Sequence, residues 1–121
     1  MAENDPIQFA KEVARIVSDN KAEDVVVLDL RNISTVTDVV VICSGTSERQ
    51  MRAAADHVVA YGKKVGERPY GFCGYDSGAW IVVDYVDVVL HVFAKPYREY
   101  YDLELLWGDA PQVDWSRSES A

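Results

Sequence analysis

Two runs of consecutive apolar residues constrain the fold more than any other feature of this sequence. Residues 25–28 and 39–43 carry an apolar side chain at every position, and most of these side chains are β-branched. Because side chains alternate between the two faces of a strand, strands of this composition are buried on both faces. Helices must then cover both faces of the sheet, which predicts an α/β fold, a three-layer α/β sandwich with a mixed β-sheet.

Two helices are predicted in the first half of the chain. Asp5 and Pro6 are typical of an N-cap and a first helical position, and apolar residues at helical spacing follow them. Ser47 followed three residues later by Gln50 matches a capping box, so a second helix is expected to begin there and to end near Gly66.

The C-terminal half is predicted to add strands and a third helix. Pro69 restricts the residues around it to an edge strand or an extended loop. Residues 80–93 are rich in β-branched and aromatic side chains and predict two strands. Pro96 is followed by helix-forming residues, which predicts one continuous helix as far as Trp107.

The length of 121 residues predicts a single domain with one core. We expect residues 1–108 to form this domain and residues 109–121 to form an irregular C-terminal tail, whose polar end, 116–121, is expected to be mobile.

The charge of the chain limits its partners. A net charge of −8 argues against non-specific binding to a phosphate backbone and favours a basic partner or no macromolecular partner. Cys43 and Cys73 form no CxxC pair, which indicates reduced thiols and no zinc site. The N-terminus lacks a signal-peptide pattern and no apolar run is long enough for a membrane span, so we expect a cytoplasmic protein without a membrane association.

Three features were considered as catalytic candidates. The turn at residues 44–47 opens a helix and would suit an anion, but it lacks the lysine and spacing of a P-loop, so an ordinary capped turn is favoured. Asp38, Asp84 and Asp87 would suit a divalent metal, yet a spacing of three puts Asp84 and Asp87 on opposite faces of a regular strand. Alternatively, Asp84 ends one strand and Asp87 begins its partner at a tight hairpin.

His91 is the remaining catalytic candidate, and its neighbours in the sequence are apolar. A core or interface role is favoured over a general base, although the spacing does not exclude a cysteine partner. No catalytic residue, metal ligand or cofactor is therefore predicted.

The C-terminal third contains more aromatic side chains than one helix face can bury in the core. Tyr100, Leu103 and Trp107 lie at helical spacing, and Tyr97, Tyr101 and Glu104 form an adjoining face of the same predicted helix. Surplus tyrosine and tryptophan are typical of protein-binding surfaces, so binding of a partner is favoured over a purely structural role.

Several segments, taken in their order along the chain, resemble one known protein family. Residues 42–47 and 55–59, then 80–93, and finally 98–107 resemble the ribosomal silencing factor family, also called the Iojap family. The resemblance runs from about residue 7 to Gly108, which is nearly the whole predicted domain.

The resemblance implies a nucleotidyltransferase-like fold without a transferase role. It implies a translational repressor that binds the large ribosomal subunit through ribosomal protein L fourteen, prevents the small subunit from joining, and lowers protein synthesis when nutrients are limiting. It also implies that homodimers form in some settings. The alternative is a metal-dependent nucleotidyl- or phosphotransferase that uses the 44–47 turn with Asp38, Asp84 or Asp87.

Carried onto this chain, the resemblance implies a binding surface built from the last two strands and the C-terminal helix. The apolar candidates for this surface are Trp80, Tyr85, Phe93, Tyr100, Tyr101, Leu103 and Trp107. The acidic candidates are Asp84, Asp87, Glu99 and Glu104, with His91 and Arg98 in supporting positions.

Overall fold

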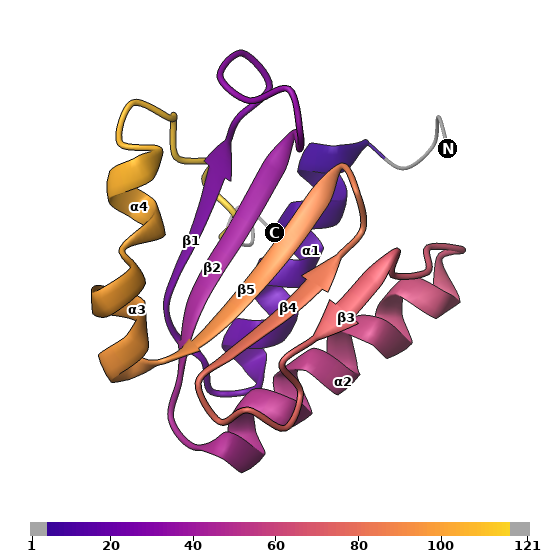
Figure 1. The fold of residues 1–121 in the computed structure, drawn as a ribbon. Coiled ribbons are helices and arrows are strands. Elements are labelled where there is room, and N and C mark those ends of the chain that lie inside the picture. Colours follow the sequence, from indigo (N-terminus) through magenta and orange to yellow (C-terminus); the bar gives the residue numbers. More distant parts are fainter. Residues whose placement is uncertain (1–4, 117–121) are drawn as a thin grey trace.

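The computed structural model describes residues 5–116, in which one five-stranded sheet carries helices on both faces (Figure 1). The strands are β1 (Glu23–Asp29), β2 (Val39–Gly45), β3 (Gly71–Cys73), β4 (Trp80–Asp84) and β5 (Val88–Ala94). Their spatial order is β1-β2-β5-β4-β3; β2 and β5 are parallel and the other neighbours are antiparallel. The prediction of an α/β fold with a mixed sheet is confirmed. The closer nucleotidyltransferase-like relationship remains a prediction.

The first two helices begin where their capping residues predict. In front of α1 (Pro6–Asp19), the Asp5 carboxylate accepts a hydrogen bond from the Ile7 N–H. In front of α2 (Glu48–Lys64), the Ser47 hydroxyl accepts one from the Gln50 N–H. Gly66 follows the end of α2 with φ +86°, a left-handed conformation that glycine adopts without a steric penalty.

One face of the sheet packs against α1 and α2, which pass behind the strands in Figure 1. All seven residues of β2 are buried, as expected for a strand that is covered on both sides. Its Val39, Val41 and Cys43 belong to the larger core beneath α1 and α2, while Val40 and Ile42 belong to a second core on the other face. This alternation is the two-sided burial that the apolar run predicts.

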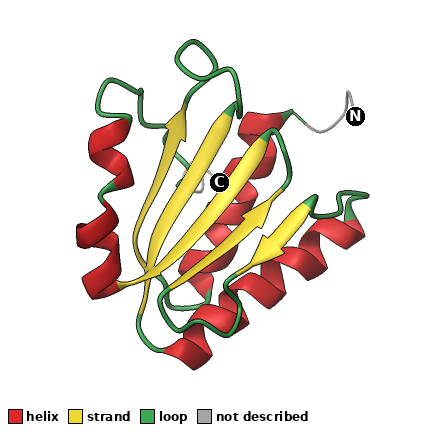
Figure 2. Ribbon diagram, in the orientation of Figure 1, coloured by secondary structure: helices red, strands yellow, loops and turns green. Residues whose placement is uncertain are grey.

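Part of the other face is covered by α3 (Lys95–Tyr101) and α4 (Leu103–Leu106), which stand at the β1 side of the sheet in Figure 2. The prediction of one continuous helix from Pro96 to Trp107 is wrong, because Asp102 adopts a left-handed conformation with φ 47° and ends α3. A left-handed residue cannot continue a right-handed α-helix, so α4 is a separate helix after Asp102. The two short helices therefore expose a different set of side chains from the set that one long helix would expose.

The segment after Gly108 is attached to the outer edge of β1. The Pro111 carbonyl accepts a hydrogen bond from Asp29, and the Val113 N–H donates one to Val27. Trp115 packs against the core beneath α1 and donates from its indole nitrogen to the Val25 carbonyl at 3.2 Å. The described part of the predicted tail therefore lies on the domain, although it forms only an isolated bridge. The expected mobility of 116–121 falls largely on 117–121, which lie outside the described residues.

None of the helices in residues 5–116 has the length and apolar character required to cross a bilayer.

Candidate partner-binding surface

An aromatic cluster joins β4, β5 and α3 on the face that carries α3 and α4. It consists of Trp80, His91, Phe93 and Tyr101, with Trp80 in the middle. The Trp80 ring lies 4.8 Å from Phe93 and 4.7 Å from Tyr101, centroid to centroid. Trp80 and Phe93 are direct cross-strand neighbours, so the sheet register fixes their contact. The cluster thereby links the end of α3 to the two strands beneath it.

His91 completes this cluster as a neutral side chain. The Trp80 indole can only donate, so Nδ1 of His91 accepts its hydrogen bond at 3.0 Å and the ring proton resides on Nε2. Burial lowers the pKa of His91 to about 4, and the nearby Asp84 carboxylate opposes that shift only in part. His91 therefore orients the Trp80 indole and carries no charge at neutral pH.

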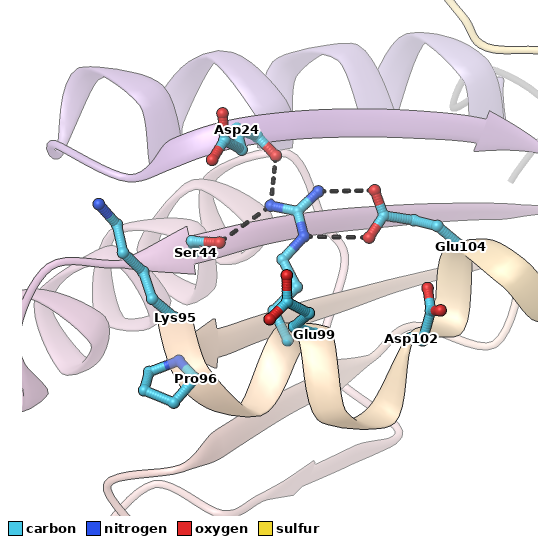
Figure 3. A pocket seen from close by; sticks show the side chains of 8 residues that line it. Asp24, Ser44, Lys95, Pro96, Glu99, Asp102 and Glu104 are labelled. Atoms are coloured by element: carbon cyan, nitrogen blue, oxygen red, sulfur yellow. Dashed lines mark hydrogen bonds and ion pairs between the residues drawn. The ribbon is translucent and has the colours of Figure 1, made fainter.

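Arg98 holds α3, α4 and the sheet together. Its guanidinium donates two parallel hydrogen bonds to the Glu104 carboxylate, 3.1 Å from Nε and 3.0 Å from Nη2, across the break at Asp102 (Figure 3). Nη1 donates to the Ser44 hydroxyl at 3.0 Å and to the Asp24 carbonyl at 2.5 Å. The Arg98 side chain is only 11% exposed, whereas the Glu104 side chain is 38% exposed, so the guanidinium is shielded from solvent and the carboxylate only in part. These contacts suit a positioning role for Arg98, and its supporting role on a binding surface stays a prediction.

A hollow of about 730 Å³ lies around the Arg98 and Glu104 pair. Four acidic residues line it, namely Asp24, Glu99, Asp102 and Glu104, against Lys95 and Arg98. Arg98 is already paired with Glu104, and Lys95 forms an ion pair with Glu23 at the start of β1. The rim next to the aromatic cluster is therefore acidic.

The outer side of α3 and α4 exposes large apolar side chains. We call this the α3–α4 patch, and it comprises Tyr97, Tyr100, Tyr101, Leu105 and Leu106. Tyr100 is 78% exposed, Leu105 75% and Leu106 70%. These five supply half of the large apolar side chains that residues 5–116 expose. Isolated apolar residues on a surface are ordinary, whereas a group confined to two short adjoining helices indicates an interaction surface.

The structure divides the predicted contact residues into exposed and buried sets. Tyr100 and Tyr101 lie on the α3–α4 patch, whereas Trp80, Leu103 and Trp107 are half-buried against the second core. Tyr85 and Phe93 are buried, so their assignment as direct contact residues is wrong. Phe93 lies beneath Trp80 and Tyr101, and Tyr85 turns to the opposite face of the sheet, where it packs edge-on against Phe9.

Two residues of the α3–α4 patch, Leu105 and Leu106, were missed by sequence reasoning, and Tyr97 was placed on the adjoining helix face but not among the contact candidates. The continuous-helix prediction placed Leu103 and Trp107 on one stripe with Tyr100. The break at Asp102 instead turns Leu103 and Trp107 toward the sheet and leaves Leu105 and Leu106 exposed.

A second hollow lies on the sheet face that carries α3 and α4, in the part of that face beyond α4. We call it the hairpin groove. Its volume is about 780 Å³. Its apolar lining comes from Val36, Tyr70, Val86, Val89 and Trp107, and Asp84, His91 and Thr37 supply polar groups. Val36 and Tyr70, which were not predicted to contribute, are 83% and 82% exposed. The groove adjoins the aromatic cluster on this face of the sheet, because His91 belongs to both.

The aspartates proposed for a metal site occupy one end of the sheet. Asp84 ends β4 and Asp87 precedes β5, which confirms the predicted hairpin, and the Asp38 N–H donates to the Asp87 carbonyl. Within residues 5–116, no group of three or more histidine, cysteine or acidic side chains is arranged to hold a metal ion. The turn after Ser44 lies at the opposite end of β2, about 20 Å from Asp38 at the usual rise of a strand. The two halves of the proposed transferase site are therefore apart.

Neither cysteine is placed to act with His91. Cys43 faces the core beneath α1 and α2, and burial raises the pKa of its thiol to about 12. Cys73 shares the face of His91 but lies two strands away across Val82, a separation of about 10 Å at the usual strand spacing. Within residues 5–116, the structure thus brings neither cysteine to this histidine.

The fold and this surface define a small mixed-sheet α/β domain with an apolar face rimmed by acidic residues. The family described as "Ribosomal silencing factor during starvation" matches residues 3–121, and the chain belongs to this family. The chain is 44% identical over 98 residues to the ribosomal silencing factor RsfS of Halalkalibacterium halodurans, covering 81% of this chain and 84% of that protein. The corresponding protein of Bacillus subtilis is 42% identical over 104 residues, covering 86% and 88%.

A crystal structure of a Chromobacterium violaceum protein superposes with a TM-score of 0.83 at 30% identity and covers 97% of each chain. The fold described above is therefore also that of an experimentally determined structure.

Proposed function

We propose that the protein is a translational repressor that binds the large ribosomal subunit. In this proposal it binds through ribosomal protein L fourteen, sterically prevents the small subunit from joining, and thereby lowers protein synthesis under nutrient limitation. The chain acts in the cytoplasm as a binding protein and not as an enzyme. Membership of the ribosomal silencing factor family supports the ribosome as the target.

The α3–α4 patch is the observation that carries the proposal. Its Tyr101 packs against Trp80, and the adjacent rim supplies Glu99 and Asp102 as exposed acidic groups. Interfaces draw much of their binding energy from a few aromatic anchors, and acidic rims steer a basic partner and fix its orientation. A chain of net charge −8 suits a basic ribosomal protein and would be repelled by exposed rRNA.

Self-association would draw on the same apolar surface. A second copy that covered Tyr100 and Leu106 would exclude the ribosomal partner, so we infer that any homodimer competes with ribosome binding.

Co-sedimentation with isolated large subunits tests the proposed function. The wild-type protein is expected to pellet with large subunits and to reduce their association with small subunits. Tyr100→Ala and Leu106→Ala are expected to weaken binding roughly tenfold each, because both residues are exposed and their loss leaves the cores intact.

Phe72→Ala is the matched control, since Phe72 is also an exposed aromatic residue but shares the opposite face of the sheet with Val83. Wild-type protein that pellets no better than an unrelated acidic protein would refute the proposed function. Equal weakening by all three variants would refute the assignment of the surface.

A further inference from the structure

The hairpin groove has the properties of a site for one particular kind of side chain. Three segments that are distant in the sequence enclose it: the loop around Val36, the β4–β5 hairpin with Tyr70 beside it, and Trp107 after α4. Its volume of about 780 Å³ lies in the range of pockets that enclose a ligand, so it has room for a long side chain and the main chain that carries it.

The walls of the groove suit an aliphatic stem. Val36, Val86 and Val89 supply β-branched surface, and the first two are exposed in the free protein. Tyr70 and Trp107 add two aromatic rings. Covering such surface favours an occupant with a run of methylene groups, and aromatic rings also attract a cation that lies against their faces.

Asp84 supplies the charge of the groove. Its Oδ1 accepts the Val86 N–H at 2.7 Å, which fixes the orientation of the carboxylate at the end of β4. No lysine or arginine occurs among the described residues that line the groove. His91 is neutral in this environment, so it does not offset the charge of Asp84. The groove therefore has a net negative charge in an otherwise apolar setting, where an opposite charge is held more strongly than in open water.

Thr37 is an independent sign of a missing ligand. It lines the groove and is 9% exposed, and its Oγ1 has no hydrogen-bond partner within residues 5–116. Buried hydroxyl groups are almost always paired, because an unpaired one forfeits the hydrogen bonds that it makes in water. This oxygen has almost no accessible surface in the free protein, so an N–H group of an occupant would satisfy it after a rotation of the Thr37 side chain toward the groove.

We propose that the hairpin groove binds one long cationic side chain, a lysine or an arginine, of the basic partner. The methylene stem lies along the valines, and the cationic head donates hydrogen bonds to the free side of the Asp84 carboxylate and to Thr37. This inference rests on the proposed function for the source of the side chain, while the chemistry of the groove can be tested without the ribosome. It assigns to Asp84 a direct role in recognition and adds a second contact site beyond the α3–α4 patch.

The first experiment probes the groove in the isolated protein. The full ¹⁵N-labelled chain is titrated with the N-acetyl amides of lysine, arginine and norleucine, the last being an uncharged stem of similar length. Saturable shifts are expected at the amides of Val86 and Val89 with lysine or arginine, and at least tenfold weaker binding with norleucine. Shifts of equal size with norleucine, or no saturable shifts in the groove with either cation, would overturn the proposal.

Two aspartate variants separate charge from structure. Asp84→Asn removes the charge but retains the oxygen that accepts the Val86 N–H, so the hairpin is expected to remain folded. Asp76→Asn is the matched control, because Asp76 is exposed in the turn between β3 and β4 and does not line the groove. Cation binding is expected to fall about tenfold in Asp84→Asn and to stay at the wild-type value in Asp76→Asn.

The second experiment repeats the co-sedimentation with large subunits over a range of salt concentrations. Asp84→Asn is expected to bind about tenfold more weakly than wild type at low salt and with a shallower salt dependence, whereas Asp76→Asn is expected to retain wild-type behaviour. If the wild type binds and Asp84→Asn binds equally well, the role of the groove in docking is refuted and the proposed function stands. If the wild type fails to bind large subunits, the proposed function fails, and the titration still decides whether the groove takes a cationic side chain.

Discussion

The Tyr85 hydroxyl lies directly over Gly62, so closely that a Cβ on Gly62 would come within 2.9 Å of the oxygen. The hydroxyl is thus confined between α2 and the β4–β5 hairpin. It has no hydrogen-bond partner within the described part of the chain, and burial raises the pKa of Tyr85 to about 12. The phenol therefore remains protonated and contributes to the domain mainly through its ring, which packs 4.9 Å from that of Phe9.

Replacing this tyrosine should stabilise the protein. Tyr85→Phe keeps the ring contact and removes an unpaired buried hydroxyl, so the free energy of unfolding is expected to rise by about 1 kcal/mol. Urea denaturation measures the change. Tyr61→Phe is the control: Tyr61 also stacks on Phe9 but is half-buried, and we expect little change there. Binding to large subunits should be unaffected, and a loss of stability in Tyr85→Phe would mean that the hydroxyl has a partner in solution.

His91 should make the protein less stable in mild acid. Its pKa is about 4 in the folded protein against an ordinary value of 6.5, so the unfolded chain takes up the proton first as the pH falls. The contribution of neutral His91 to the free energy of unfolding is fully present above about pH 6.5. It is lost as the pH falls toward 4. Between pH 7.5 and pH 5 the loss is expected to be about 2 kcal/mol.

The matched variant for this prediction is His91→Gln, which does not titrate but retains an oxygen that can accept the Trp80 N–H. Urea denaturation of both proteins at the two pH values isolates the histidine contribution, because every other titrating group is common to them. An identical pH dependence of the two proteins would show that His91 is not the cause.

Breaking the Arg98 and Glu104 pair should loosen α4 in particular. Glu104→Gln removes one charge and leaves the nearly buried guanidinium without its bidentate partner, which is expected to cost about 1 to 2 kcal/mol. Hydrogen exchange is expected to quicken at the amides of α4 before it does so in β5. Glu99→Gln is the control on the same pair of helices, since Glu99 is exposed and Arg98 makes its carboxylate hydrogen bonds with Glu104. Unchanged exchange in α4 would argue against a positioning role for Arg98.

Trp115 should contribute to stability despite its place near the C-terminus. Trp115→Ala removes packing against the first core and the indole hydrogen bond to Val25, and it retains the main-chain carbonyl to which Arg15 donates. The expected cost is about 2 to 3 kcal/mol, measured by urea denaturation. Gln112→Ala is the comparison, because Gln112 is exposed and bridges β1 through its main chain. Equal stability of the two variants would indicate that the side chain of Trp115 contributes little.

Much of the sheet could be predicted because the residues concerned act locally. The apolar run of β2 requires cover on both sides, and Asp5 and Ser47 supply oxygens at the first turns of α1 and α2. Asp84 ends β4 where its carboxylate caps the turn into the hairpin. None of these features depends on a distant part of the chain.

The exposed apolar patch falls on segments that the sequence singled out, but the sequence could not divide their residues into exposed and buried sets. Nothing between Tyr97 and Trp107 is a glycine or proline, so the break at Asp102 has no local signal, and it alone decides that Leu105 faces outward. The hairpin groove depends on Val36 and Tyr70, which meet Trp107 only through the sheet order. Their contribution is a property of the tertiary fold.

The main-chain contacts between residues 111–113 and β1 affect how another protein can approach this one. They occupy part of the outward hydrogen-bonding groups of a seven-residue strand at one border of the sheet, and the strand at the other border, β3, is only three residues long. Within the described chain, the sheet thus offers little continuous border on which a foreign strand could be added, and it is protected from edge-to-edge aggregation. A partner must then be recognised through side-chain contacts. This protein can therefore select a partner by its sequence and not merely by its capacity to form a strand.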